Sequence, residues 1–173
     1  PLPAPLATPY DAFDLLFVTV GVFDCIEIDA DIELEFCLVT QDPQGNQLAE
    51  PGINRVRTYG NGPYAPMGND IQGTIQPETV WDPDKYINVW IIPLTNNQTG
   101  YAQFPANSTL TGMITSGNGG ATDGIVMNYW TIGSMAQPNP NANAYHRGRI
   151  VSHELGHYFG LRHLWGDGDC SVD

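Results

Sequence analysis

Basic side chains are scarce in this 173-residue chain. Six Lys and Arg stand against 19 Asp and Glu, which gives a formal net charge of −13. Because binding to phosphate groups requires a basic surface, this balance excludes general affinity for nucleic acids and for anionic membranes. Charged residues make up only 14% of the chain, so uncharged polar groups must cover much of the surface.

Long apolar runs are also lacking. A transmembrane helix needs about 20 consecutive apolar residues, whereas the longest apolar run, residues 15–23, is shorter and contains Thr19 and Gly21. Acidic residues flank this run where a signal peptide would carry a basic segment. We therefore expect no membrane span, and in an exported protein the leader has already been removed.

Cysteine is rare and odd in number. The chain contains Cys25, Cys37 and Cys170, which in a secreted protein implies a free thiol or a partner elsewhere. Cys37 lies in an apolar stretch, so we expect it simply to be buried. Cys170 lies in a polar loop, and we expect its partner, if it has one, in sequence outside this chain.

Hydrophobic periodicity predicts an α+β fold. Residues 1–12 are rich in proline and are expected to form a linker or tail, whereas residues 13–173 are expected to form one domain. Residues 51–80 hold many Gly and Pro and are expected to form a long irregular surface segment. We expect a helix from Asn141 or Asn143 to about Phe159, packed on one face of a twisted sheet. The predicted strands are residues 13–23, 26–38, 86–94 (a central strand covered on both faces), 101–105 (an edge piece) and 124–130.

One motif in the predicted helix carries chemistry. It reads H-E-x-x-H-x-x-G-x-x-H and places His153 and His157 one turn apart on the same helix face. Gly160 can adopt the positive φ that ends a helix, so that His163 returns as a third nitrogen ligand. Three protein ligands leave one position of a tetrahedral Zn²⁺ open for water, and Glu154 is placed to take that water's proton.

The residues around this motif resemble the pappalysin family of metzincin peptidases, with its ulilysin-like and cytophagalysin-like bacterial members. The resemblance covers roughly residues 30–170 and rests on several separate segments. These are residues 32–38 with the turn 42–45, then 52–55, 86–90, 100–105, 123–126, 148–149 and 160–168.

The resemblance implies a metzincin-like fold and a secreted zinc endopeptidase that acts on proteins or peptides, often with Ca²⁺. It implies His153, His157 and His163 as zinc ligands and Glu154 as general base and acid. In metzincins the substrate lies antiparallel to an edge strand of the sheet. The candidates for that edge, and so for substrate binding, are Tyr101, Ala102, Gln103 and Phe104.

The chain departs from the family pattern after the third histidine. Metzincins place a Met-turn downstream of it, yet the ten residues after His163 include neither Met nor Tyr, and all methionines precede the motif. The sequence therefore predicts the upper subdomain with the site helix, and no lower subdomain. A processed fragment, an incomplete chain and one half of a complex with another polypeptide all fit this pattern.

Two other readings remain open at this point. The chain fits a zinc-stabilised structural or adhesive domain without catalysis, or a fragment that needs a second chain to complete its site. Glu154 argues against a purely structural site, which has no use for that carboxylate. The acidic pair Asp167 and Asp169 fits either a Ca²⁺ site or ordinary turns.

Overall fold

The computed structural model describes residues 14–21, 36–57, 60, 62–105, 108, 120–134, 137, 139 and 148–163, and for residues 14–21 the backbone alone. The predicted tail, most of the predicted strand 26–38 and the Asp167 and Asp169 loop lie outside these residues. No helix in the described part of the chain is long and apolar enough to cross a membrane.

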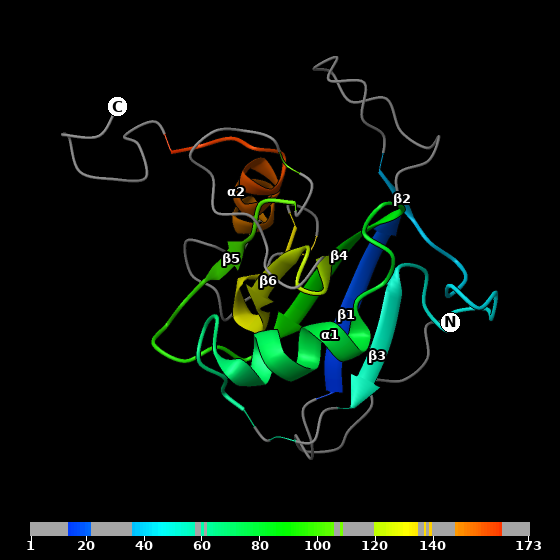
Figure 1. Ribbon diagram of the computed structural model, residues 1–173, viewed down its shortest axis with the longest axis horizontal. Helices are drawn as coiled ribbons and strands as arrows, with labels where there is room; N and C mark the ends of the chain where they lie inside the picture. The colour runs from blue at the N-terminus through cyan, green and yellow to red at the C-terminus, as the bar shows by residue number, and fades with distance from the viewer. Residues whose placement is uncertain are drawn as a thin grey trace.

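A mixed six-stranded sheet forms the centre of the fold (Figure 1). Its order is β2-β1-β4-β6-β5, and β3 pairs with the same side of β1 as β2 does. Strand β4 is antiparallel to β1 and parallel to β6, and β5 is antiparallel to β6. The strands are β1 (Asp14–Gly21), β2 (Cys37–Leu38), β3 (Ile53–Arg57), β4 (Tyr86–Ile92), β5 (Gly100–Ala102) and β6 (Ile125–Asn128). The prediction of a mixed α+β fold is confirmed.

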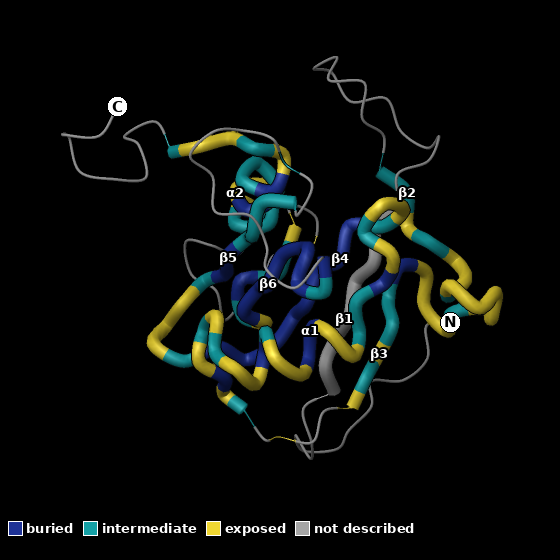
Figure 2. Tube along the Cα trace, viewed as in Figure 1, coloured by how far each residue is buried: buried dark blue, intermediate teal, exposed yellow. Residues whose placement is uncertain are grey.

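Strand β4 is covered on both faces, as its apolar run predicts. Ile87, Val89 and Ile91 face a core cluster that includes Tyr158 of the helix α2 (Arg149–Tyr158). The alternate residues Trp90 and Ile92 belong to a second cluster on the opposite face. Figure 2 shows β4 and β6 as the buried centre of the molecule, with exposed loops around them. Side chains at alternate positions therefore attach α2 to one side of the sheet.

The prediction of an irregular segment at residues 51–80 is wrong for about half of its length. It contains β3 and a helical segment made of a short π-helix, η1 (Ile71–Ile75), that continues into α1 (Gln76–Thr79). Ile71 and Ile75 are one helical turn apart and both are buried in the second cluster. Pro77 lies in the first turn of α1, directly after the junction with η1. This segment covers the sheet face opposite α2.

A buried polar side chain connects the end of this segment to β4. Asn88 is fully buried, accepts a hydrogen bond from the Trp81 N–H (2.9 Å) and donates one to the Trp81 carbonyl (2.9 Å). Its amide also approaches the Asp123 carbonyl at 3.4 Å, just before β6. These bonds hold the chain entering β4 against the chain entering β6.

Cys37 is disulfide-bonded and half-buried, so the expectation that it is simply buried in an apolar strand is wrong. The other two cysteines of the chain lie outside the described residues. The apolar neighbours of Cys37 suggested simple burial, but a short edge strand leaves its side chain only half-buried.

Candidate metal centre

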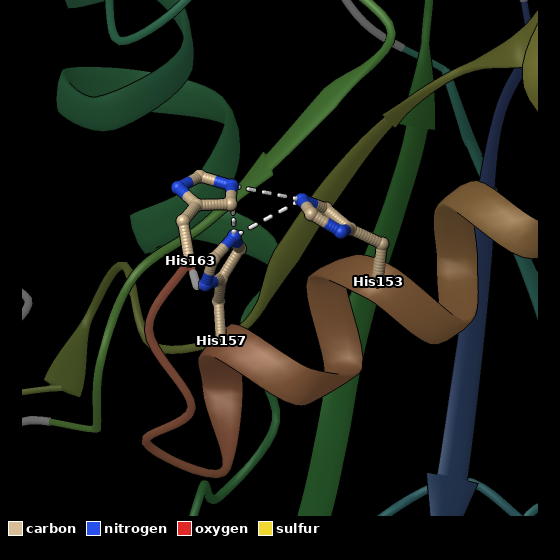
Figure 3. A group of neighbouring side chains, drawn as sticks. All are labelled: His153, His157 and His163. Carbon is tan, nitrogen blue, oxygen red and sulfur yellow. Dashed lines mark hydrogen bonds between the residues drawn. The ribbon is translucent and has the colours of Figure 1, made fainter. Parts of the chain in front are cut away.

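Helix α2 supplies two of the three histidines. It begins at Arg149 after Gly148, whose φ of +76° is left-handed, so the predicted start at Asn141 or Asn143 is wrong. The helix packs against β5 and β6, and Tyr158 and Leu155 contribute to the core beneath it. The four-residue spacing places His153 and His157 on one face of α2, with their rings pointing toward each other, as Figure 3 shows.

The end of α2 is a Schellman motif, and it places the third histidine. Gly160 has φ +89°; its N–H donates to the His157 carbonyl (2.8 Å), and the Leu161 N–H donates to the Gly156 carbonyl (2.9 Å). This 5→2 and 6→1 pair closes the helix and requires a left-handed residue at Gly160. The chain then reverses, and His163 returns above His157 (Figure 3).

The three imidazoles converge on one point. Their Nε2 atoms lie 3.1 Å apart for His157 and His153, 3.1 Å for His157 and His163, and 3.2 Å for His163 and His153. Two nitrogens at roughly 2.0–2.1 Å from a tetrahedral zinc would lie about 3.3 Å apart. The donor set therefore fits Zn²⁺ in both chemistry and size. In the described part of the chain no other group of three His, Cys, Asp or Glu side chains could hold a metal.

The proton positions on these rings favour metal binding. The Nδ1 of His157 lies 2.8 Å from the Leu161 carbonyl oxygen. Because a carbonyl can only accept, Nδ1 carries the proton, and the Nε2 of a neutral ring is left with a lone pair directed at the other two histidines. Burial, and then the charges of His157 and His163, lower the pKa of His153. A lowered pKa keeps this ring neutral, as ligation requires.

Glu154 lies beside the histidines on the sheet side of the helix. Its side chain is buried, with 6% of its surface exposed. Burial raises the pKa of its carboxyl group, while the charges of His157 and His163 and a hydrogen bond from the Ala102 N–H oppose that rise. A carboxylate with a raised pKa is a stronger base than an exposed one. The arrangement thus brings a buried base next to a three-nitrogen metal site.

The residues proposed for substrate binding do not all face the same side of the sheet. Strand β5 forms the edge of the described sheet, and Ala102 lies on the α2 side. The Tyr101 side chain points to the opposite core cluster, where its hydroxyl oxygen accepts a hydrogen bond from the Met67 N–H (3.3 Å). The Gln103 N–H points inward, 3.4 Å from the Gly124 carbonyl. Of the described groups in residues 101–104, the Ala102 N–H is the one bonded to a site residue.

The sequence did not predict two features of the site. The Leu161 carbonyl fixes the orientation of His157, and the Ala102 N–H holds the Glu154 carboxylate. Both are main-chain groups, and residue types give no signal for them. A pocket of about 320 Å³ adjoins the site, and its lining residues are Ser152, His153, Gly156, His157, Leu161, Arg162 and His163. It gives the metal position access from solvent.

The comparison with known proteins agrees with this geometry. Residues 72–173 match the model of the M43 peptidase family, described as pregnancy-associated plasma protein-A, which is the pappalysin family. Proteins named extracellular metalloprotease from Arthroderma benhamiae and Trichophyton verrucosum are each 31% identical over 90 residues, and one from Arthroderma gypseum is 30% identical. These alignments cover 50% of this chain and 27% of each relative.

The chain therefore spans about a quarter of the length of the curated relatives that it matches. Among solved structures, no significant match to the chain exists. The family model covers more than half of the chain and includes all three histidines of the metal centre. The chain belongs to the M43 peptidase family of pregnancy-associated plasma protein-A.

Proposed function

We propose that this chain carries the catalytic centre of a secreted zinc endopeptidase. The convergence of His153, His157 and His163 within 3.2 Å of one another, beside the buried Glu154, is the observation that carries the proposal. Three nitrogen ligands leave an open coordination position, which distinguishes catalytic from closed structural zinc sites. Zinc bound there would supply Lewis acidity, which polarises the scissile carbonyl and lowers the pKa of water.

In this proposal Glu154 moves the protons of the reaction. Its carboxylate accepts a proton as the water oxygen bonds to the carbonyl carbon of the substrate. It then donates that proton to the nitrogen as the C–N bond breaks; the second proton of the water passes from the new carboxyl group to the amine, so that an ammonium and a carboxylate leave. The raised pKa of Glu154 favours both halves of this exchange, because the group must bind and release a proton in each turnover.

The substrate in this proposal is an extended peptide that pairs antiparallel with β5. Of the candidates Tyr101, Ala102, Gln103 and Phe104, Ala102 contributes through main-chain groups that face outward, while Tyr101 and Gln103 direct theirs toward β6. The hydrogen bond between the Ala102 N–H and Glu154 supports this placement, because it brings the base directly to the strand edge. The peptide bond to be cleaved would then lie alongside Ala102.

The disulfide of Cys37 and the names of the relatives support secretion. Disulfides form and persist in oxidising compartments outside the cytosol. The relatives from Arthroderma and Trichophyton are named extracellular. Calcium remains a proposal based on the family resemblance, since the residues considered for it lie outside the described part of the chain.

Replacing Glu154 with Gln tests the proposal. Glu154→Gln keeps the shape of the side chain and removes the base, so we expect bound zinc to stay at one equivalent while cleavage of peptide substrates falls about 10²–10⁴-fold. Glu78→Gln is the matched control, because Glu78 is an exposed acid on α1, on the other face of the sheet. Wild-type protein that binds zinc and cleaves no peptide would instead favour a structural zinc domain.

A further inference from the structure

The register of β5 determines which of its main-chain groups face outward. The strand pairs with β6 through Gly100 with Met127, Tyr101 with Val126 and Ala102 with Ile125. The Asn128 N–H donates to the Thr99 carbonyl (2.9 Å), so odd-numbered residues of this segment direct their main-chain groups toward β6. The N–H and C=O groups of Gly100 and Ala102 consequently point away from β6, toward the side where a peptide would pair.

Two of these outward groups already have partners within the chain. The Ala102 N–H donates to the Glu154 carboxylate. The Gly100 carbonyl accepts a hydrogen bond from the side-chain amide of Gln98, with Nε2 at 3.0 Å. Gly100 is buried while Gln98 is exposed, so the amide lies on the solvent side of the carbonyl that it binds.

The backbone of Gln98 is itself fixed. Its N–H lies 3.2 Å from the Thr95 carbonyl across a turn in which Asn96 and Asn97 have φ near +59° and +54°. Its carbonyl accepts a hydrogen bond of 2.9 Å from Asn128, whose side chain is buried in the core. The side chain of Gln98 therefore starts from a rigid point and needs little ordering to reach Gly100.

A peptide antiparallel to β5 has a defined orientation on this edge. If the scissile bond lies beside Ala102 and Glu154, the residues after that bond run alongside the residues that precede Ala102. Two residues at about 3.3 Å each bring the peptide to Gly100. A substrate residue after the scissile bond would pair with the Gly100 carbonyl, but it meets the side-chain amide of Gln98 at that position.

We propose that Gln98 is a specificity-determining residue that closes the Gly100 carbonyl to main-chain pairing on the leaving-group side of the substrate. This inference rests on the proposed function. Because the Gly100 carbonyl is closed, substrate residues beyond the first ones after the scissile bond gain no main-chain hydrogen bond there. Peptides with few residues after the scissile bond are therefore cleaved as well as peptides with many. Specificity on that side then depends on side chains.

The test compares Gln98→Met with Gln47→Met in the full-length, zinc-loaded protein. Methionine keeps the length of the side chain and lacks the N–H donor. Gln47 is a matched control, since its exposed amide donates to the Thr40 carbonyl in a loop of the β2–β3 region, remote from β5. Two fluorogenic peptides of one sequence, ending one or three residues after the scissile bond, give a ratio of kcat/KM values. Binding of the same peptides in the Glu154→Gln background gives a second ratio that needs no turnover.

Gln98→Met is expected to raise both ratios, each taken as the value for the long peptide over that for the short one, by roughly 2- to 10-fold. This is the effect of the one net hydrogen bond that the long peptide gains at the Gly100 carbonyl. Gln47→Met should leave both ratios at the wild-type value. Unchanged ratios in Gln98→Met would overturn the inference while leaving the peptidase assignment standing. If the wild type cleaves neither peptide, the proposed function fails, and the binding ratio alone still decides the role of Gln98.

Discussion

Gly160 links the end of the helix to the metal centre, and its replacement by alanine has two separable effects. At φ +89° an alanine is in the left-handed region, which costs roughly 1–2 kcal/mol relative to its preferred conformations. Gly45 has nearly the same φ, +85°, in the turn after Asp42, and an added Cβ there meets no atom within 4 Å. Gly160→Ala and Gly45→Ala should therefore lower the free energy of unfolding of the zinc-free protein by at most this amount.

Only Gly160→Ala should weaken zinc binding. The left-handed turn places the Leu161 carbonyl on His157 and returns His163 to the metal position. The zinc-free variant can relax out of the left-handed turn, and zinc binding must then restore the turn. Restoring it costs about 1–2 kcal/mol, which lowers the zinc affinity roughly 5- to 30-fold. Gly160→Asn should show a smaller loss, because asparagine tolerates the left-handed region.

The assay is competition for zinc against a chromophoric chelator, with unfolding by urea measured on the same zinc-free samples. Equal zinc affinity in Gly160→Ala and Gly45→Ala would refute the reasoning, since the turn would then not position the third ligand. A loss of zinc affinity in Gly45→Ala would show that the effect comes from general destabilisation.

Three further predictions concern alkaline pH, metal removal and the buried amide. Burial raises the pKa of Tyr101 to about 12, above its ordinary value. The buried, neutral side chain therefore contributes fully to the free energy of unfolding below pH 10, and this contribution is lost as the pH rises toward 12. Tyr101→Phe should therefore remove about 2–3 kcal/mol of the stability loss that urea unfolding measures between pH 10 and pH 12, and an unchanged loss would contradict this prediction. Removing zinc with a chelator should lower the unfolding free energy by about 2.7 kcal/mol when free zinc had been 100 times its Kd, and no change in melting temperature would contradict a native metal site. Asn88→Ala removes two hydrogen bonds to the Trp81 backbone and should cost about 2–4 kcal/mol in urea unfolding; a loss below 0.5 kcal/mol would show that these bonds contribute little.

The parts of the fold that the sequence predicted correctly are those with a simple repeat. The continuous apolar run of β4 indicated a strand buried on both sides, and its alternate residues do pack into two separate clusters. The spacing of the histidines predicted their convergence because helix geometry brings residues four apart together. Gly160 was expected to take a positive φ and end the helix, and it does so.

The parts that it missed depend on contacts remote in sequence. The segment before Trp81 contains Gly73 and Pro77, which argue for a loop, yet tertiary packing of Ile71 and Ile75 stabilises a helical segment there. The start of α2 was placed too early, because asparagine is a frequent cap, whereas the helix begins after a left-handed Gly148. The bond from the Ala102 main chain to Glu154 joins residues 52 positions apart, which no local pattern reveals.

Zinc K-edge X-ray absorption of the zinc-loaded protein tests the central claim most directly. We predict three imidazole nitrogens and one further light atom at about 2.0–2.1 Å, which corresponds to His153, His157 and His163 with one position left for water or substrate. His163→Ala should reduce the imidazole contribution to two rings. A sulfur shell at about 2.3 Å, or a wild-type spectrum with fewer than three imidazoles, would contradict the account.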